Sequence, residues 1–306
     1  MRSYALRRLL SIVPTLLMVA TLVFILVRLV PGGPFDQERA VPAEVERALN
    51  AKYHLDDPVW KQYGDWLWAL LSRGDLGPTF KYPNRTVNEI IALSLPVSMQ
   101  LGSLAMLFAL AVGVPLGVIG AVRQNTWKDT AAMAAAMVGV SVPRFVLAPL
   151  LILIFSLHLY IFPVARWETW RHMVLPVICA GLPAAAYIAR LTRGGMLEVI
   201  RSDFIRTARA KGLSERVVMF KHVLKNAMIP IITSIVIEIP FLITGALLIE
   251  NFFGIPGLGS QLVDAFNTSD LPVIKAQVVM FSILYMVFNL LTDVLYAAVD
   301  PRVSLK

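Results

Sequence analysis

Six long apolar runs, separated by polar connections, make up most of the sequence. They lie at about 9–27, 97–121, 131–157, 173–191, 228–250 and 276–298. A helix needs about 20 apolar residues to cross roughly 30 Å of hydrocarbon, and each run is close to that length or longer. The pattern predicts an all-α, polytopic membrane protein with six transmembrane helices, of which the first is an uncleaved helix.

The distribution of lysine and arginine orients these predicted helices. The connection 190–225 carries nine cations and three acids, whereas the long segment 31–95 carries seven cations and nine acids. Short connections rich in Lys and Arg stay in the cytoplasm, while long outside segments are translocated largely regardless of charge. We therefore expect a multi-pass protein with both termini in the cytoplasm.

The orientation divides the chain into three parts. Residues 1–30 form the cytoplasmic N-terminus and the first helix, 31–95 an extracytoplasmic segment, and 96–306 a five-helix core that contains a cytoplasmic loop at about 190–228. Within the outside segment, residues 42–49 resemble a helix start, with proline and acids in the first turn. Three tryptophans that suit a membrane interface follow: Trp60, Trp66 and Trp68. We expect this segment to cap the outer mouth of the core.

Composition agrees with a membrane environment, because 57% of the residues are hydrophobic and only 16% are charged. The net charge of +8 follows mainly from the orientation. No zinc-finger spacing or RNA-binding aromatic pattern accompanies it, so we expect membrane lipid and no nucleic acid as a partner. The single cysteine, Cys179, lies in an apolar run, where we expect a small buried side chain rather than a disulfide.

The search for catalytic motifs is negative. The GxxxxGK[ST] pattern that binds nucleotide phosphates is absent, and so are HExxH, GxSxG and SxxK. The four histidines lie on different segments without the spacing of metal ligands. We expect no catalytic residue, no metal site and no cofactor held by this chain, and therefore not an enzyme.

Polar residues recur at helical spacing on the fifth and sixth predicted helices. They form two stripes: Ser234, Glu238, Phe241 and Gly245, then Met286, Asn289 and Asp293. Charged groups inside a membrane are costly and are often functional. Two interpretations stay open, because the stripes can line a solvated pathway or can make helix–helix contacts with satisfied hydrogen bonds. On the second helix, Gly113 and Gly117 have the GxxxG spacing that favours close helix packing.

The cytoplasmic loop predicts a short helix. Asp203 or Ser202 can cap its start, and Gly212 can end it in the left-handed conformation. Two turns of helix are too few to be stable in water without tertiary contacts. The helix carries three apolar residues among its arginines: Phe204, Ile205 and Ala208. This composition favours docking to another protein, with a helix lying on anionic lipid as the alternative.

This loop resembles the EAA loop of ABC importer permeases, in which the EAA triplet is followed by three residues and a glycine. Here Arg206-Thr207-Ala208 is followed by three residues and Gly212. The later I-x-L-P element corresponds to His222-Val223-Leu224-Lys225. The acid, the first alanine and the proline are replaced, but the stretch Thr207 to Leu213 (TARAKGL) has the form typical of the dipeptide/oligopeptide branch.

The resemblance to the B-type permease of that branch extends over essentially the whole chain. The motifs that carry it are Leu6-Arg7-Arg8, Arg28-Leu29-Val30-Pro31-Gly32, Gly74-Asp75-Leu76-Gly77, Leu191-Thr192-Arg193, Gly254-Ile255-Pro256-Gly257-Leu258-Gly259, Asp293-Val294-Leu295-Tyr296 and Asp300-Pro301-Arg302. It implies a type I ABC importer permease fold in the inner (cytoplasmic) membrane of a bacterium.

The resemblance further implies a function: a permease subunit of an ATP-driven oligopeptide or dipeptide importer. A C-type paralogous permease would complete the pathway, and an extracytoplasmic binding protein would deliver the peptide. Two cytoplasmic ATPase subunits would bind ATP and Mg²⁺. The residues that would couple the permease to them are Asp203, Phe204, Arg206, Thr207, Ala208, Arg209, Ala210, Lys211 and Gly212.

Two other classes of protein remain as alternatives. An ion-gradient-coupled peptide transporter is expected to have an internal repeat or discontinuous half-helices around an ion site. No internal repeat is found, and only Glu238 and Asp293 favour ion coupling. A membrane scaffold without transport would not need helices rich in proline with polar stripes.

Overall fold

The computed structural model describes residues 2–29, 51, 54–82, 85–228, 231–232 and 246–299, with side chains from residue 11 to residue 293. Its helices are α1 (Arg2–Leu29), α3 (Val59–Arg73), α4 (Val87–Val122), α5 (Trp127–Ser141), α6 (Arg144–Leu151), the π-helix η1 (Ile152–His158), α7 (Trp170–Ile200), α8 (Asp203–Ala210), α9 (Glu215–Val217), the π-helix η2 (Val218–Leu224), α11 (Leu247–Phe252), α12 (Leu258–Asn267) and α13 (Leu271–Val299). Over these residues the structure has no strand, only an isolated bridge between Pro78 and Thr86. The all-α prediction is confirmed.

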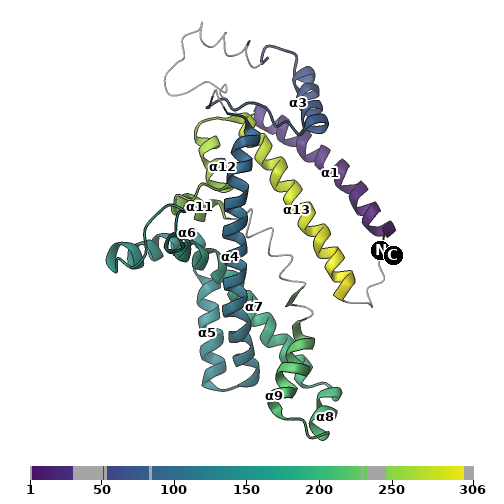
Figure 1. Ribbon diagram of the computed structural model, residues 1–306, viewed down its shortest axis with the longest axis vertical. Helices are drawn as coiled ribbons and strands as arrows, with labels where there is room; N and C mark the ends of the chain where they lie inside the picture. The colour runs from purple at the N-terminus through teal and green to yellow at the C-terminus, as the bar shows by residue number, and fades with distance from the viewer. Residues whose placement is uncertain are drawn as a thin grey trace.

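The helices form two groups that run along the same long axis (Figure 1). In the first group α7 packs against both α4 and α5, and in the second α1 packs against α13. The short helix α12 contacts both α4 and α13, and so joins the two groups. Helix α3 lies over one end of α1, whereas α8 and α9 lie at the opposite end of the molecule (Figure 1).

Within the described residues, four helices are long and apolar enough to cross a membrane: Ser11–Leu29 of α1, all of α4, all of α7, and Leu271–Asp293 of α13. A fifth crossing is possible if α5 and the helix that follows it count as one span. The predicted single run 131–157 is wrong as a continuous helix, because the chain bends by 102° between Ser141 and Arg144. Pro143 explains the break, since its ring and missing N–H prevent the helix from continuing.

The remaining predicted span, 228–250, lies largely outside the described residues, so six spans stay a prediction. Helix α4 begins earlier than expected, at Val87 rather than near residue 97. The side chain of Thr86 accepts a hydrogen bond from the backbone N–H of Glu89, and the Glu89 carboxylate accepts one from the N–H of Thr86. This capping box fixes the start of the helix ten residues ahead of the apolar run.

Close contact between α4 and α7 depends on small residues. A Cβ atom on Gly113 would lie 2.5 Å from the carbonyl oxygen of Ala185, and one on Gly117 would lie 2.5 Å from that of Ala189. Both distances are too short for any side chain. The packing role predicted for the GxxxG spacing is confirmed.

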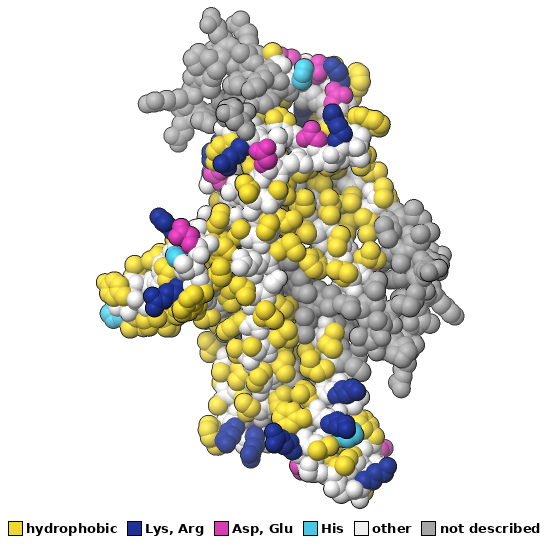
Figure 2. All heavy atoms as spheres, viewed as in Figure 1, with side chains coloured by type: hydrophobic (Ala, Val, Ile, Leu, Met, Phe, Trp, Pro, Cys, Tyr) yellow, Lys and Arg dark blue, Asp and Glu magenta, His cyan; other side chains and the backbone are white. Residues whose placement is uncertain are grey.

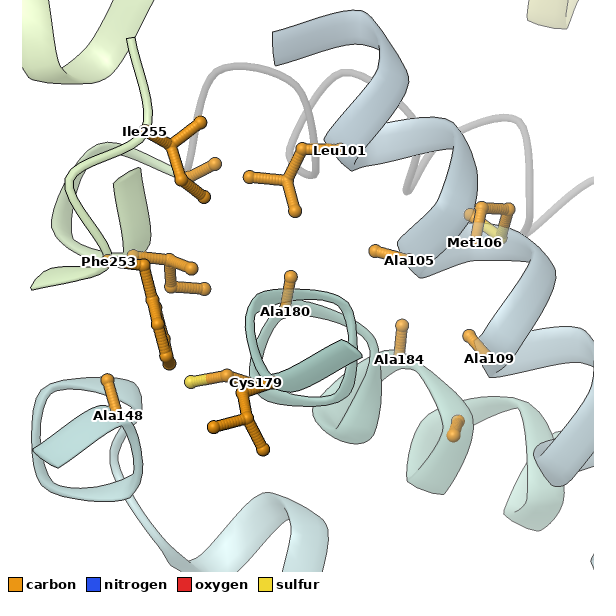
Figure 3. Close-up of a cluster of buried hydrophobic side chains, with 14 of the residues drawn as sticks. Leu101, Ala105, Met106, Ala109, Ala148, Cys179, Ala180, Ala184, Phe253 and Ile255 are labelled. Carbon is orange, nitrogen blue, oxygen red and sulfur yellow. The ribbon is translucent and has the colours of Figure 1, made fainter. Parts of the chain in front are cut away.

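The main hydrophobic core lies where α4, α6, α7 and the segment after α11 meet (Figure 3). Cys179 is fully buried there, as expected, and it points toward Ala148 and Phe253. Small side chains such as Ala105 and Ala180 let the helices approach closely, while Phe253 fills the space beside them.

Residues 54–82, 85 and 86 cover the end of the molecule opposite α8. Helix α3 is held on α1 by a hydrogen bond of 2.7 Å between the hydroxyls of Tyr63 and Thr21. The following loop is held by the buried Asp270, whose carboxylate accepts hydrogen bonds from the Thr79 hydroxyl at 2.6 Å and from the Phe80 N–H at 3.1 Å. A cap at one end is therefore present, although residues 42–49 lie outside the described part.

Charge differs between the two ends. Figure 2 shows a wide apolar band, with Lys and Arg gathered at the α8 end and both signs of charge mixed at the α3 end. At the α3 end, the Lys81 ammonium lies 2.8 Å from the Asp264 carboxylate. Burial disfavours the charge of Lys81, but its hydrogen bonds to Asp264 and Tyr82 outweigh burial and raise its pKa. The excess of unbalanced cations therefore lies at the α8 end.

Candidate functional site

The site predicted from the loop is α8, a helix of two turns that follows α7 after a short break. Ser202 is its N-cap residue, but the Ser202 hydroxyl donates to the carbonyl oxygen of Val199 at 2.6 Å and does not cap the helix. Asp203 is the first helical residue, and its carboxylate lies 3.4 Å from the Arg206 guanidinium. The predicted helix is confirmed, whereas the predicted side-chain cap is wrong.

The other end of α8 is formed as expected. Gly212 has a φ of +77°, in the left-handed region, and its N–H donates to the carbonyl oxygen of Arg209 at 2.9 Å. The Leu213 N–H reaches back to the carbonyl of Ala208 at 3.4 Å. Nothing lies within 4 Å of the position that a Cβ on Gly212 would occupy, so the need for glycine comes from the backbone conformation alone.

Two of the three apolar residues expected to contact another protein are buried within this chain. Ile205 is fully buried and Ala208 is 8% exposed, and both pack in a cluster with Met196 of α7 and with Val218 and Val223 of η2. The expectation that Ile205 and Ala208 dock into another protein is therefore wrong. Their burial is what holds so short a helix in place.

The outward side of α8 remains open to a partner. Phe204 is 48% exposed, which leaves a large apolar surface at a charged helix. The exposed residues of the site are Asp203, Phe204, Arg206, Thr207, Arg209, Ala210, Lys211 and Gly212. The Arg209 guanidinium donates to the Glu215 carboxylate at 2.7 Å, and this ion pair ties the end of α8 to α9.

The inward side of α8 connects the loop to the membrane helices. The cluster that buries Ile205 and Ala208 also contains Ala121 at the end of α4 and Met196 near the end of α7. A packed core transmits displacement because it is nearly incompressible. A force on α8 therefore reaches the ends of two spanning helices directly.

The pathway candidates are only partly described. Ser234, Glu238, Phe241 and Gly245 all lie outside the described residues. On α13, Met286, Asn289 and Asp293 are half-buried, whereas Tyr285, Val287 and Leu291 of the same helix are exposed. The α13 stripe thus lies on a less exposed side of its helix, and its role as pathway or packing surface stays a prediction.

A buried carboxylate that the sequence patterns did not reveal lies on α11, beside the middle part of α4 (Figure 1). Glu250 of α11 is fully buried and accepts hydrogen bonds from the Ser98 hydroxyl at 2.7 Å and from the Gly259 N–H at 2.6 Å. A Cβ on Gly257 would collide with this carboxylate. Gly257 and Gly259 are therefore required by the neighbouring carboxylate of Glu250, whereas Gly254 is required by its own backbone conformation, with a φ of +58°.

An ion pair that the sequence patterns also did not reveal lies at the α8 end of the bundle. Asp129 of α5 accepts two hydrogen bonds of 2.7 Å from Arg193 of α7, in a two-pronged ion pair. Asp129 is 5% exposed and also accepts from the Asn125 N–H at 3.0 Å. Asp129 lies just before the apolar run 131–157 and Arg193 just after the run 173–191, so a charge inside an apolar run could not have pointed to either residue.

Within the described residues no group of His, Cys, Asp or Glu is arranged to hold a metal ion. The structure is therefore that of a helical membrane protein that presents a short helix at one end. The carboxyl-terminal two thirds of the chain, residues 113–305, match the family described as binding-protein-dependent transport system inner membrane component. The chain belongs to this family.

Curated relatives match over almost the full length. The dipeptide transport system permease protein DppB of Bacillus subtilis is 41% identical over 305 residues, covering 100% of this chain and 99% of the relative. The oligopeptide transport system permease protein OppB of Salmonella typhimurium is 43% identical, covering 99% of each. Among solved structures, the inward-facing MetNI methionine ABC transporter has a TM-score of 0.59 at 18% identity, covering 69% of this chain and 96% of that chain. The last likeness supports the type I importer permease fold.

Proposed function

We propose that this chain is the permease subunit of an ATP-driven importer of oligopeptides or dipeptides. The full-length similarity to OppB and DppB supports the substrate class. In this proposal a paralogous permease completes the pathway, two cytoplasmic ATPases bind ATP and Mg²⁺, and an extracytoplasmic binding protein delivers the peptide. The chain itself performs no catalysis in this proposal, and the similarity to peptide importer permeases does not support the ion-gradient alternative.

The observation that carries the proposal is that one side of α8 is buried against this chain while other residues of α8 are exposed. Its inward residues are locked to the ends of α4 and α7, while Phe204 and Arg206 on its other side are exposed. Such a helix can receive a push from a partner and pass it to the membrane helices. The gathering of cations at this end supports a cytoplasmic location for α8. The proposal places both termini on the same side of the membrane.

Reconstitution of the chain with its co-purifying subunits tests this function. We expect uptake of short peptides that requires ATP and binding protein and that continues without an ion gradient. Arg206→Glu should lower uptake and the stimulation of ATP hydrolysis by loaded binding protein, because its side chain is about three-quarters exposed and faces the proposed partner. Lys221→Glu, on the same surface but outside α8, is the matched control.

Uptake that follows a proton or sodium gradient without ATP would refute the proposal. Normal coupling in the Arg206→Glu variant, together with normal subunit assembly, would refute the role of α8.

A further inference from the structure

A groove of about 850 Å³ opens beside α8, between the end of α4, the start of α5, and η2. Its apolar wall includes Ile119, Val122 and Phe220, which are 43%, 46% and 57% exposed. Four cations also line it: Arg123, Lys128, Arg209 and Arg216. The groove is thus apolar along a spanning helix and positive where that helix ends.

The charge of this groove is not neutralised by the described part of the chain. Glu215 is the only acid that lines it, and its carboxylate is bound to Arg209 at 2.7 Å. The three other cations form no ion pair with any described residue. The Lys128 ammonium instead lies 5.7 Å from the ring centre of Trp127, a side chain that is 75% exposed. Exposed tryptophan beside lysine is typical of a membrane–water boundary.

We propose that this groove binds an anionic phospholipid. The groove lies where the apolar run of α4 ends at Val122 and the polar turn begins at Arg123, which is the depth of the lipid headgroups. An acyl chain would lie along Ile119, Val122 and Phe220, and the phosphate would lie among the cations. Basic pockets between membrane helices bind anionic headgroups in this way. A soluble anion would leave the apolar wall uncovered.

The lipid would also support the proposed coupling. Arg216 follows the Arg209–Glu215 pair, and Phe220 belongs to η2, the helix on which α8 packs. A lipid held by α4 and η2 would therefore brace the platform beneath α8. This consequence rests on the proposed function, whereas the lipid site itself requires only that the chain lies in a membrane.

The test measures lipid binding directly. The full-length chain, purified with its co-purifying subunits and stripped of lipid by detergent exchange, is titrated with phosphatidylglycerol or phosphatidylcholine, and bound lipid is read by native mass spectrometry. We expect tighter binding of phosphatidylglycerol. A double Arg123→Gln, Arg216→Gln variant should weaken it about 30-fold, the equivalent of about 1 kcal/mol for each cation near the membrane surface.

A double Lys221→Gln, Lys225→Gln variant is the matched control, since it removes the same charge from exposed residues that do not line the groove. It should bind phosphatidylglycerol as the unaltered chain does. Gel filtration and thermal unfolding confirm that both variants are folded.

Several results would overturn the lipid site. Equal binding of phosphatidylglycerol and phosphatidylcholine by the unaltered chain would overturn the site. An equal loss of phosphatidylglycerol binding in the two double variants would also overturn it. Displacement of the lipid by millimolar inorganic phosphate would indicate a soluble anion instead. Unchanged lipid binding with loss of the ATPase from the groove variant would indicate a protein partner. None of these results depends on peptide transport, so the site and the proposed function fail separately.

Discussion

Replacing Gly212 with valine isolates the role of the end of α8. The φ of +77° at this residue places it in the left-handed region, where a residue with a Cβ costs about 1–2 kcal/mol. No atom lies within 4 Å of the new Cβ position, so the substitution introduces strain without a collision. A β-branched side chain is the least tolerant of this conformation.

The strain is relieved most easily by unwinding the last turn of α8. That turn depends on the Gly212 N–H bond to Arg209 at 2.9 Å and the weaker Leu213 N–H bond to Ala208 at 3.4 Å. A cost of about 1–2 kcal/mol changes the ratio of formed to unwound turn by about 5- to 30-fold. Because two turns do not form a stable helix alone, this shift is enough to displace the exposed side of α8.

The assay is peptide uptake together with the stimulation of ATP hydrolysis by loaded binding protein, in vesicles that contain the assembled complex. We expect Gly212→Val to lower both several-fold while membrane levels and thermal unfolding of the spans stay close to normal. Gly212→Asn is the control, because asparagine tolerates the left-handed conformation. If valine and asparagine behave alike and both couple normally, the position of the α8 end does not matter and the argument fails.

Three further predictions follow from the packing. Ala208→Trp should lower the thermal unfolding midpoint, because overpacking the buried cluster costs about 1–3 kcal/mol. Ala210→Trp, on the exposed side of α8, should leave the midpoint unchanged and impair coupling. Equal midpoints for the two variants would contradict the burial of Ala208. Glu250→Ala should destabilise by about 2–6 kcal/mol in thermal unfolding, because the buried N–H groups of Gly259 and Ser260 lose their acceptor, and Glu250→Gln should restore part of this. Cysteines at Lys61 and Lys81 should react with an impermeant reagent in intact cells and one at Lys211 only after permeabilisation; labelling of position 211 in intact cells would reverse the orientation.

Periodicity and length were sufficient to predict the helical class and most of the spans. They could not predict the break between Ser141 and Arg144, because a run of apolar residues gives the same signal whether a helix is straight or bent by 102°. Pro143 marked the place, but prolines also occur inside α4 and α7 without breaking them. The presence of a proline in an apolar run therefore does not tell a broken helix from a continuous one.

The position and length of α8 were predicted from the sequence, but the side of α8 that packs against the chain was not. Gly212 and the two-turn length follow from local rules, which is why the ends of α8 were placed correctly. Which side of α8 faces inward depends on η2, a segment that reaches α8 only in the folded chain. Phe204, Ile205 and Ala208 are all apolar, so composition alone could not tell which of them the chain buries for itself.

The buried carboxylate of Glu250 shows why distant partners matter for function. Its hydrogen-bond donor Ser98 lies in the first half of α4, whereas Ala121 at the end of α4 packs with Ile205 and Ala208 of α8. Helix α4 therefore contacts α11 through a hydrogen bond and contacts α8 through a packed cluster. Rigid helices that contact two sites carry coupling between them. On the proposed function, a displacement of α8 by a partner would therefore be passed along α4 from Ala121 to the Glu250 network beside Ser98.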